Sequence, residues 1–441
     1  MKYAYNSKCR KSKRRAGATV LTIASLAFPI SATAEPVHAP SIVITASPLA
    51  RTTSELAQPV SIVEKEEISR SGAATLGNLL GAQPGVAQSS FTRGASRPII
   101  RGLDNSRVRI QENGLAAHDV SALSEDHGVP IDPSAAERVE VIRGPAALRY
   151  GSEAIGGLVS VLNNRIPDKA PDGGFEAEAE ANTTTADSGV MGRGSVDVSE
   201  GPIAVHIDAF ARSADDYSTP QGTQANSAAE ASGLSAGVSY LLPNGHVGVS
   251  VTQYNSDYRV PGAKAAANRI AIDLEQMRYA AAARLEDLSG FFTGLSADVG
   301  YSDYIHEEVS KVTGTIGSRF DNEEWEGRLE LLHRAIGDVE GAWGIQAASR
   351  DLSAAGEGGE LIAPSTSNRF AAFLFEEWKI NPALRLQVSG RIERVELEGL
   401  GTTSPTLEGV TLPGQELADF GSRRSLDFTP ISSAAALVFD L

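Results

Sequence analysis

The stretch IAVHIDAFAR, residues 203–212, decides the fold, because apolar and polar side chains alternate along it. Successive side chains of a β-strand point to opposite faces of the sheet. One face would carry Val205, Ile207, Ala209 and Ala211, and the other His206, Asp208 and Arg212. A strand with one apolar and one polar face is typical of a barrel that crosses a membrane, and it also fits a soluble β-sandwich.

The same alternation recurs from Gly173 onward. We expect twelve strands, at residues 174–182, 190–198, 203–212, 233–241, 246–254, 274–285, 291–303, 325–334, 341–350, 369–380, 384–395 and 427–440. Short turns, such as Pro243-Asn244-Gly245, alternate strictly with long polar connections, such as residues 213–232. Barrels in lipid have this arrangement, and closure gives every backbone group a partner, so the pattern favours an antiparallel transmembrane β-barrel over residues 171–441. A β-sandwich explains the alternating connections less well.

Residues 1–34 predict a secretory signal peptide. Residues 1–15 carry seven basic side chains and no acid, residues 16–30 are uncharged and largely apolar, and Ala32-Thr33-Ala34 matches a cleavage site. Its removal would also remove Cys9, the only cysteine, and would change the net charge from −16 to −23. We therefore expect export by the general secretory route, no disulfide or thiolate site, and no nucleic-acid partner.

Residues 51–170 predict a compact α+β domain. Its expected elements are strands at residues 60–63, 98–102, 107–112, 138–143 and 157–163, a helix with glycine interruptions at residues 65–81, and a short helix that begins with Pro133 and is capped by Asp132. No lysine lies between Lys65 and Lys169, although arginines recur there. Because arginine suits enclosed ion pairs, we expect this domain to face carboxylates inside a larger structure.

A β-prone hexapeptide lies between Pro40 and Pro48, directly after the signal. It consists of Ile42, Val43, Ile44, Thr45, Ala46 and Ser47. The flanking prolines disfavour a place in the interior of a sheet, so we expect this segment to stay extended and available to a partner.

Residues 40–441 resemble the TonB-dependent outer-membrane receptors. The stretch SIVITAS (41–47) resembles the TonB box of that family, and IIRGLDNSRVRIQENG (99–114) and ERVEVIRGPAALRYGSEAIGGLVSVLNN (137–164) resemble its plug signatures. The resemblance implies a linker with the box at residues 35–50, a plug domain at 51–170 and a place among the lipids of a Gram-negative outer membrane. It also implies TonB, with its inner-membrane energising complex, as a partner that adds a strand to the box.

The stretch HDVSALSEDHGVPIDP, residues 118–133, is rich in potential metal ligands. These are His118, Asp119, Glu125, Asp126, His127 and Asp132. Glycine and proline predict a loop, in which neighbouring residues can reach one ion. Imidazole and carboxylate without thiolate suit Zn²⁺, and they also admit Mn²⁺, Ni²⁺ or Cu²⁺.

Within the family, this stretch most resembles the zinc-uptake (ZnuD-type) receptors, in which an Asp-His pair of the plug binds zinc. The resemblance carries that role to Asp126 and His127 only, and His118 of the same ligand-rich stretch is a further candidate. The resemblance also implies a carboxylate from the barrel. The expected fourth outer loop offers YIHEE (304–308), where Glu308 is the candidate and Glu307 the alternative. Zn²⁺ would then be the transported ligand, and no prosthetic group is implied.

Three functions remain open. The leading hypothesis is import of zinc or a similar divalent metal ion into the periplasm, and the alternatives are a receptor for a siderophore, cobalamin or other chelated cargo, and a non-transporting remnant. The outer loops hold few aromatic residues, which favours a metal ion over a chelated or organic cargo. We expect no enzyme, because Ser152 does not lie in a G-x-S-x-G turn and no nucleophile meets a base and an oxyanion site.

The barrel is expected to be incomplete. Leu441 falls at the end of the twelfth expected strand, whereas plugged transporters have about 22 strands. Twelve strands would enclose too narrow a lumen for a plug, so we expect a longer receptor with about ten further strands.

Ile44→Pro should abolish TonB binding while export and membrane insertion persist. Proline removes a backbone donor and resists strand pairing, on which an added strand depends. Pull-down with the periplasmic domain of TonB measures the effect, and undiminished binding would contradict the assignment of the box.

Overall fold

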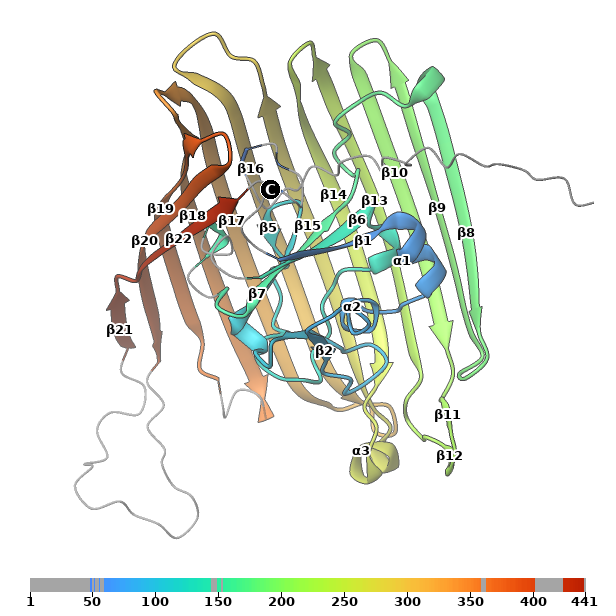
Figure 1. Cartoon of the computed structure of the whole chain (residues 1–441). Coiled ribbons are helices and arrows are strands. Elements are labelled where there is room, and N and C mark those ends of the chain that lie inside the picture. The colour runs from blue at the N-terminus through green and yellow to red at the C-terminus, as the bar shows by residue number, and fades with distance from the viewer. Residues whose placement is uncertain are drawn as a thin grey trace, which may run out of the picture. The chain divides into compact units, whose positions relative to one another are not determined.

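The computed structural model describes residues 48–49, 51, 55, 59–143, 149–151, 154–357, 362–400 and 423–439. The expected signal peptide and the hexapeptide of residues 42–47 lie outside the described residues, as do residues 144–148 and 152–153 of the second plug signature. The described elements form a mixed domain and a large antiparallel sheet, which Figure 1 shows side by side.

The mixed domain, hereafter the plug, is built on a five-stranded sheet of order β1-β6-β7-β4-β5. Its strands are β1 (Val60–Glu64), β4 (Val108–Glu112), β5 (Leu115–Ala116), β6 (Arg138–Ile142) and β7 (Gly157–Leu162). β4 and β7 pair in parallel and the other pairs are antiparallel. A separate two-stranded ribbon joins β2 (Val86–Gln88) to β3 (Pro98–Ile100). The strands expected in this domain are therefore confirmed.

The helix expected over residues 65–81 with glycine interruptions is present as two short helices. α1 (Lys65–Ser71) ends at Gly72, which takes the left-handed conformation (φ 57°) that terminates helices, and α2 (Leu76–Leu80) begins after the side-chain cap of Thr75. The expected cap at Asp132 is confirmed, since its carboxylate accepts a 2.8 Å hydrogen bond from the Ser134 amide at the start of a 3-10 helix, Pro133–Ala135. Among the described residues, no helix has the length and apolar character to cross a membrane.

The core of the plug lies between its helices and its sheet. Ile68 and Leu80 from the helices pack with Val139 and Val159 from the central strands, and all four are buried. Burying a side chain of this size stabilises the fold by about 1.5–3 kcal/mol. Four such contacts give the plug its own apolar centre, independent of the surrounding sheet.

The large sheet has 13 strands, which are antiparallel to their neighbours. They are β8 (Phe175–Thr184), β9 (Gly189–Glu200), β10 (Ile203–Ala214), β13 (Ala229–Leu242), β14 (Gly245–Arg259), β15 (Ile270–Leu285), β16 (Phe292–Ser310), β17 (Ile316–Ile336), β18 (Val339–Gly356), β19 (Ser365–Asn381), β20 (Leu384–Leu400), β21 (Arg423–Phe428) and β22 (Ile431–Phe439). Each pairs with the next in chain order, except that β21 and β22 both pair with β20. The connections include a small hairpin of β11 (Ser218–Thr219) and β12 (Gly222–Thr223), and a helix, α3 (Ala263–Asn268).

Eleven of the expected strands correspond one to one with β8–β10 and β13–β20, and the expected twelfth is divided into β21 and β22 around Pro430. The strands run further than expected at two of the long polar connections, which leaves residues 260–269 with α3 between β14 and β15, and residues 311–315 between β16 and β17. Parts of these strand ends, such as Asn255-Ser256-Asp257 and Asp321-Asn322-Glu323-Glu324, are polar on both faces, and such a segment has no alternation of polarity that distinguishes it from a loop.

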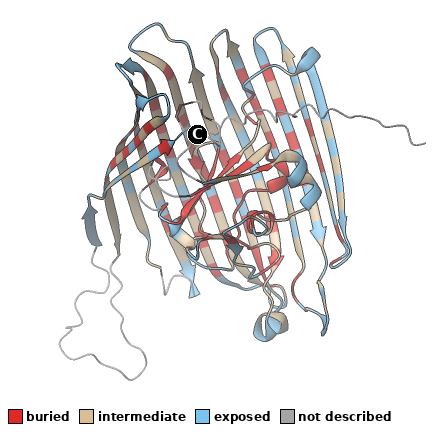
Figure 2. Cartoon of the chain, in the orientation of Figure 1, coloured by how far each residue is buried: buried red, intermediate tan, exposed pale blue. Residues whose placement is uncertain are grey.

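The alternation of residues 203–212 is confirmed. Ile207 is 48% exposed, whereas its neighbours His206 and Asp208 are only 5% and 3% exposed. The same pattern runs through the large sheet, as the alternating colours of its strands in Figure 2 show. An apolar face turned outward and a polar face turned inward is the arrangement that lipid requires of a barrel wall.

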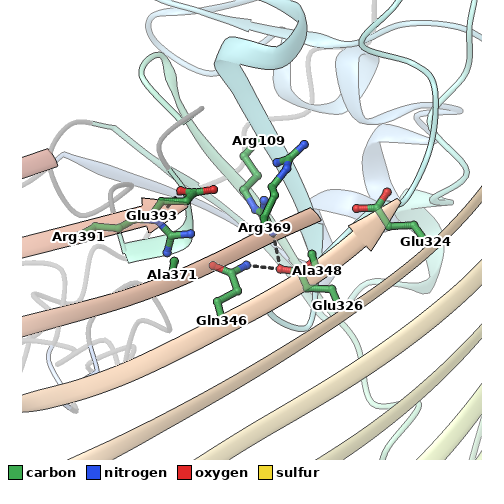
Figure 3. Close-up of a pocket in the computed structure, with 10 residues that line it drawn as sticks. Arg109, Glu324, Glu326, Gln346, Ala348, Arg369, Ala371, Arg391 and Glu393 are labelled. Carbon is green, nitrogen blue, oxygen red and sulfur yellow. Dashed lines mark hydrogen bonds and ion pairs between the residues drawn. The ribbon is translucent and has the colours of Figure 1, made fainter. Parts of the chain in front are cut away.

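Arginines of the plug pair with carboxylates on the inner face of the sheet. Arg109 donates to Glu326 on β17 at 2.6 Å, and the amide of Gln346 also bonds Glu326 (Figure 3). Arg149 donates twice to Glu330, also on β17, with its Nε at 2.6 Å. Burial alone would lower the pKa of Arg149, but the Glu330 charge raises it above its ordinary value. The expectation that plug arginines face enclosed carboxylates is confirmed for these two residues.

Other plug arginines bond within the plug. Arg97 donates to the Ser121 hydroxyl and to backbone carbonyls, and Arg143 donates to the Ser61 hydroxyl and the Pro84 carbonyl. For these two residues the expectation of a carboxylate from a surrounding structure is wrong. Their hydrogen bonds join loops of the plug to each other.

Glu330→Gln should lower the free energy of unfolding by about 3–5 kcal/mol, because it leaves the buried guanidinium groups of Arg149 and Arg328 without their counter-charge. Thermal unfolding of the detergent-solubilised chain measures the change. Glu323→Gln is the matched control, since Glu323 is exposed on the same strand, and its effect should stay within about 0.5 kcal/mol. Equal effects of the two variants would contradict the importance of the buried pair.

Candidate metal centre

Three potential metal ligands converge between the plug and β16. The donor atoms of His127, His306 and Glu308 all lie within 4.8 Å of one another. His127 belongs to the loop that follows β5, which confirms the expected loop, and His306 and Glu308 lie near the end of β16. Residues two apart on a strand share a face, so β16 turns both side chains toward the plug.

Glu307, the alternative carboxylate, points the other way. It lies between the two ligand candidates on β16, and its carboxylate accepts a 2.5 Å hydrogen bond from Arg319 of β17. Because neighbouring side chains of a strand point to opposite faces, Glu308 faces the cluster and Glu307 does not. In a loop, both side chains could have faced the cluster.

The imidazole of His127 is oriented by its own loop. Its Nδ1 lies 3.1 Å from the carbonyl oxygen of Val120, and because a carbonyl only accepts hydrogen bonds, Nδ1 carries the proton. In the neutral imidazole, Nε2 then keeps its lone pair. A histidine whose second nitrogen donates to a backbone carbonyl is the usual form of a metal ligand.

His306 has a buried nitrogen that no neighbour satisfies. Its side chain is fully buried, its Nδ1 lies 3.3 Å from the Tyr304 hydroxyl, and its Nε2 has no hydrogen-bond partner among the described residues. The ring centroids of His306 and His127 are 4.3 Å apart. An unsatisfied buried polar atom costs about 1–3 kcal/mol, so a ligand for this nitrogen would stabilise the site.

Asp126 lies at the edge of the cluster. Its Oδ1 is 3.8 Å from Nε2 of His127 and accepts a hydrogen bond from the Ser124 hydroxyl. Ligands around a tetrahedral zinc ion, bound at about 2.0–2.1 Å, are about 3.4 Å apart. The Asp126 carboxylate thus lies near the spacing of a neighbouring ligand with respect to His127, although it is not one of the three donors that lie within 4.8 Å of one another.

His118 lies in a different place. Its Nε2 is 3.3 Å from Glu326, which faces Gly300 of β16. Gly300 lies six residues before His306, or about 20 Å along an extended strand. The structure thus brings Asp126, His127 and Glu308 together and places His118 with the ion pair of Arg109.

Apolar and aromatic side chains lie beside the cluster. They belong to a buried group of Val120, Tyr258, Ile272, Leu274, Tyr304 and Phe320, in which Ile272 and Leu274 are the β15 partners of Glu308 and His306. The Phe320 ring contacts both imidazoles, with centroid distances of 4.9 Å to His127 and 5.5 Å to His306. In such surroundings a charge interacts more strongly with its partners than in water.

His306 was not predicted as a ligand, although it lies in the YIHEE stretch. The signal that could have found it is the two-residue spacing of His306 and Glu308, which puts both on one face of a strand. The stretch was interpreted as a loop, and in a loop that spacing has no such meaning.

Comparisons with known proteins agree with this architecture. A family model, the TonB-dependent Receptor Plug Domain, matches residues 52–158. The vitamin B12 transporter BtuB of Vibrio vulnificus (strain CMCP6) is 29% identical over 184 residues, which make up 39% of this chain and 30% of BtuB. The copper transporter OprC has a TM-score of 0.74 at 16% identity, over 89% of this chain and 63% of OprC. The alcaligin receptor FauA of Bordetella pertussis has a TM-score of 0.68 at 18% identity, over 91% of this chain and 63% of FauA.

Residues 52–158 thus match the plug domain of the TonB-dependent receptors, and the plug with its large antiparallel sheet shares the fold of solved outer-membrane transporters. The expected fold class and the expected location in the Gram-negative outer membrane are therefore confirmed, and the family consists of transporters, not enzymes. The chain spans less than a third of the length of BtuB and just under two thirds of the length of OprC and FauA.

His306→Ala and His127→Ala should each weaken Zn²⁺ binding at least about tenfold, because each removes one nitrogen donor from the cluster. Isothermal titration of the purified, metal-stripped chain measures the affinity. His246→Ala is the control, since His246 lies at the opposite end of β14 from the segment beside the cluster. Unchanged affinity in either ligand variant would exclude that histidine from the site.

Proposed function

We propose that this chain serves TonB-dependent import of an unchelated divalent transition-metal ion, Zn²⁺ before others, across the outer membrane. The observation that carries the proposal is the meeting of His127, His306 and Glu308, three donors that come from the plug and from the barrel wall. The site would hold the ion as cargo, between binding from outside and release into the periplasm.

The donor set supports a transition metal over Mg²⁺ or Ca²⁺. Two imidazoles and a carboxylate suit Zn²⁺, Cu²⁺ or Ni²⁺, whereas Ca²⁺ takes six to eight oxygen ligands and Mg²⁺ keeps several waters. The free Nε2 of His306 and the lone pair of His127 are nitrogen donors. Zn²⁺ accepts three or four such ligands in a tetrahedral arrangement, which Asp126 or a water could complete.

The burial of the two histidines favours a metal ion without a chelator over a metal chelate as the cargo. His127 is 3% exposed and His306 is fully buried, and apolar side chains surround both. A siderophore or cobalamin needs a pocket of several hundred Å³ lined by groups that contact it, and the two imidazoles could not touch so large a ligand. The sequence similarity to a vitamin B12 transporter makes a chelated cargo the second candidate.

The division of the site between two parts suggests how the ion is released. His127 moves with the plug, whereas His306 and Glu308 belong to β16. Any displacement of the plug separates the donors, and each tenfold loss of affinity corresponds to about 1.4 kcal/mol of work. TonB, pairing with residues 42–47 and pulling, would supply that work in a membrane that has no nucleotide of its own.

Uptake of radioactive zinc by cells that lack other outer-membrane zinc receptors tests the proposal. Cells that produce the receptor should accumulate zinc under chelation, His127→Ala should reduce the rate at least about tenfold, and Ile44→Pro should abolish it. Immunoblots of outer membranes establish equal amounts of the three proteins.

The same cells distinguish the other functions. Uptake of cobalamin or of a ferric siderophore in place of zinc would contradict the proposal and favour a chelated cargo. Zinc binding by the purified chain without uptake would show a protein that binds the ion and does not transport it.

A further inference from the structure

Tyr258 of β14 reaches the plug beside the proposed metal centre. Its side chain is fully buried, and its hydroxyl accepts a 2.8 Å hydrogen bond from the Gly128 amide. The same hydroxyl donates at 2.7 Å to the carbonyl of Asp126. These two backbone groups flank His127, so one side chain of the barrel holds the chain on both sides of a proposed ligand.

Glycines of the plug make room for the Tyr258 ring. A Cβ atom on Gly94 would overlap Cγ and Cδ1 of the ring, and one on Gly128 would lie 2.7 Å from the Gly94 carbonyl oxygen. The turn at Gly94 is held by the Thr92 hydroxyl, which accepts hydrogen bonds from the amides of Gly94 at 3.0 Å and Ala95 at 3.2 Å. Residues 92–95, residues 126–128 and β14 therefore meet at the Tyr258 ring.

Hydrogen bonds inside the loop that carries His127 set the shape of that loop but not its position against the barrel. His127 bonds Val120 through its ring and Ser124 through its amide, and both partners belong to the same loop. Other barrel side chains bond the loop near its two ends, at the carbonyls of residues 116–119 and at the Asp132 carboxylate. Tyr258 contacts the stretch between those ends.

We infer that Tyr258 is a positioning residue for the proposed metal centre. Its hydroxyl fixes the backbone of residues 126–128 so that the His127 imidazole meets His306 and Glu308 of β16. The inference rests on the proposed function. Tyr258 offers no ligand atom in the cluster, yet its hydrogen bonds would account for a measurable part of the metal affinity.

Tyr258→Phe is the direct test, because it keeps the ring over Gly94 and removes both hydrogen bonds. The affinity of the metal-stripped full chain for Zn²⁺ should fall about tenfold, as is usual when a group that orients a ligand is lost. The visible absorption of bound Co²⁺ should change as well, because it reports the coordination geometry, which a general loss of stability would not alter.

Two further variants sharpen the test. Gly94→Ala keeps the hydroxyl but displaces the ring, so it should reproduce the loss of affinity and the altered Co²⁺ spectrum. Tyr254→Phe is the matched control, since Tyr254 lies on the same strand and packs against the same apolar cluster. Its affinity and Co²⁺ spectrum should equal those of the parent.

Hydrogen exchange separates the failure of this inference from failure of the proposed function. In the metal-free chain, the Gly128 amide should exchange faster in Tyr258→Phe than in the parent, whether or not a metal ever binds. Unchanged exchange, or unchanged Zn²⁺ affinity with an unchanged Co²⁺ spectrum, would overturn the positioning role. A parent chain that binds neither Zn²⁺ nor Co²⁺ would overturn the proposed function itself, and with it the role of Tyr258 at a metal centre.

Discussion

A charge buried inside a barrel needs a partner of opposite charge. The ion pairs between plug arginines and β17 carboxylates therefore fix where the plug lies against the inner face of the sheet. Breaking such a pair costs several kcal/mol, so Arg109 on Glu326 and Arg149 on Glu330 define the place of the plug against β17. The register of the sheet then carries this position to β16, where Gly300 faces Glu326 and His306 faces Phe320. The loop of His127 is thereby aligned with two donors far from it in the sequence.

The alternation of apolar and polar side chains along the strands provides both the lipid-facing surface of the sheet and the donors of the proposed metal centre. The lipid-facing side requires apolar residues, and the side chains between them then turn inward, where they can pair or bind. His306 and Glu308 belong to that inward series on β16, as Glu326 and Glu330 do on β17. The rule that makes the wall stable in lipid also decides which polar residues are available to a cation inside it.

The proposed centre exists only while the plug is docked. One donor and the residues that orient it lie on the plug, and the other two lie on a strand of the wall. Tyr258 of the sheet and Gly94 of the plug meet at the same interface. The hydrogen bonds of the Tyr258 hydroxyl, the packing of its ring and the meeting of the three donors all depend on that interface. A site built this way would bind its ion tightly in one position of the plug and weakly in any other, which the proposed transport requires for release of the cargo.

The sequence by itself determined the class of fold, since alternation and connection lengths are local properties that lipid imposes on each strand. It also located the ligand-rich loop and the Asp132 cap, and it indicated that plug arginines meet carboxylates without separating Arg109 and Arg149 from Arg97 and Arg143. It did not give the full extent of the strands, because segments that are polar on both faces, such as residues 321–324, show no period. Only the tertiary structure decided which ligands meet. His306 faces His127, Glu308 faces inward where Glu307 does not, and His118 lies with Glu326, because strand register and plug docking join residues that no local pattern connects.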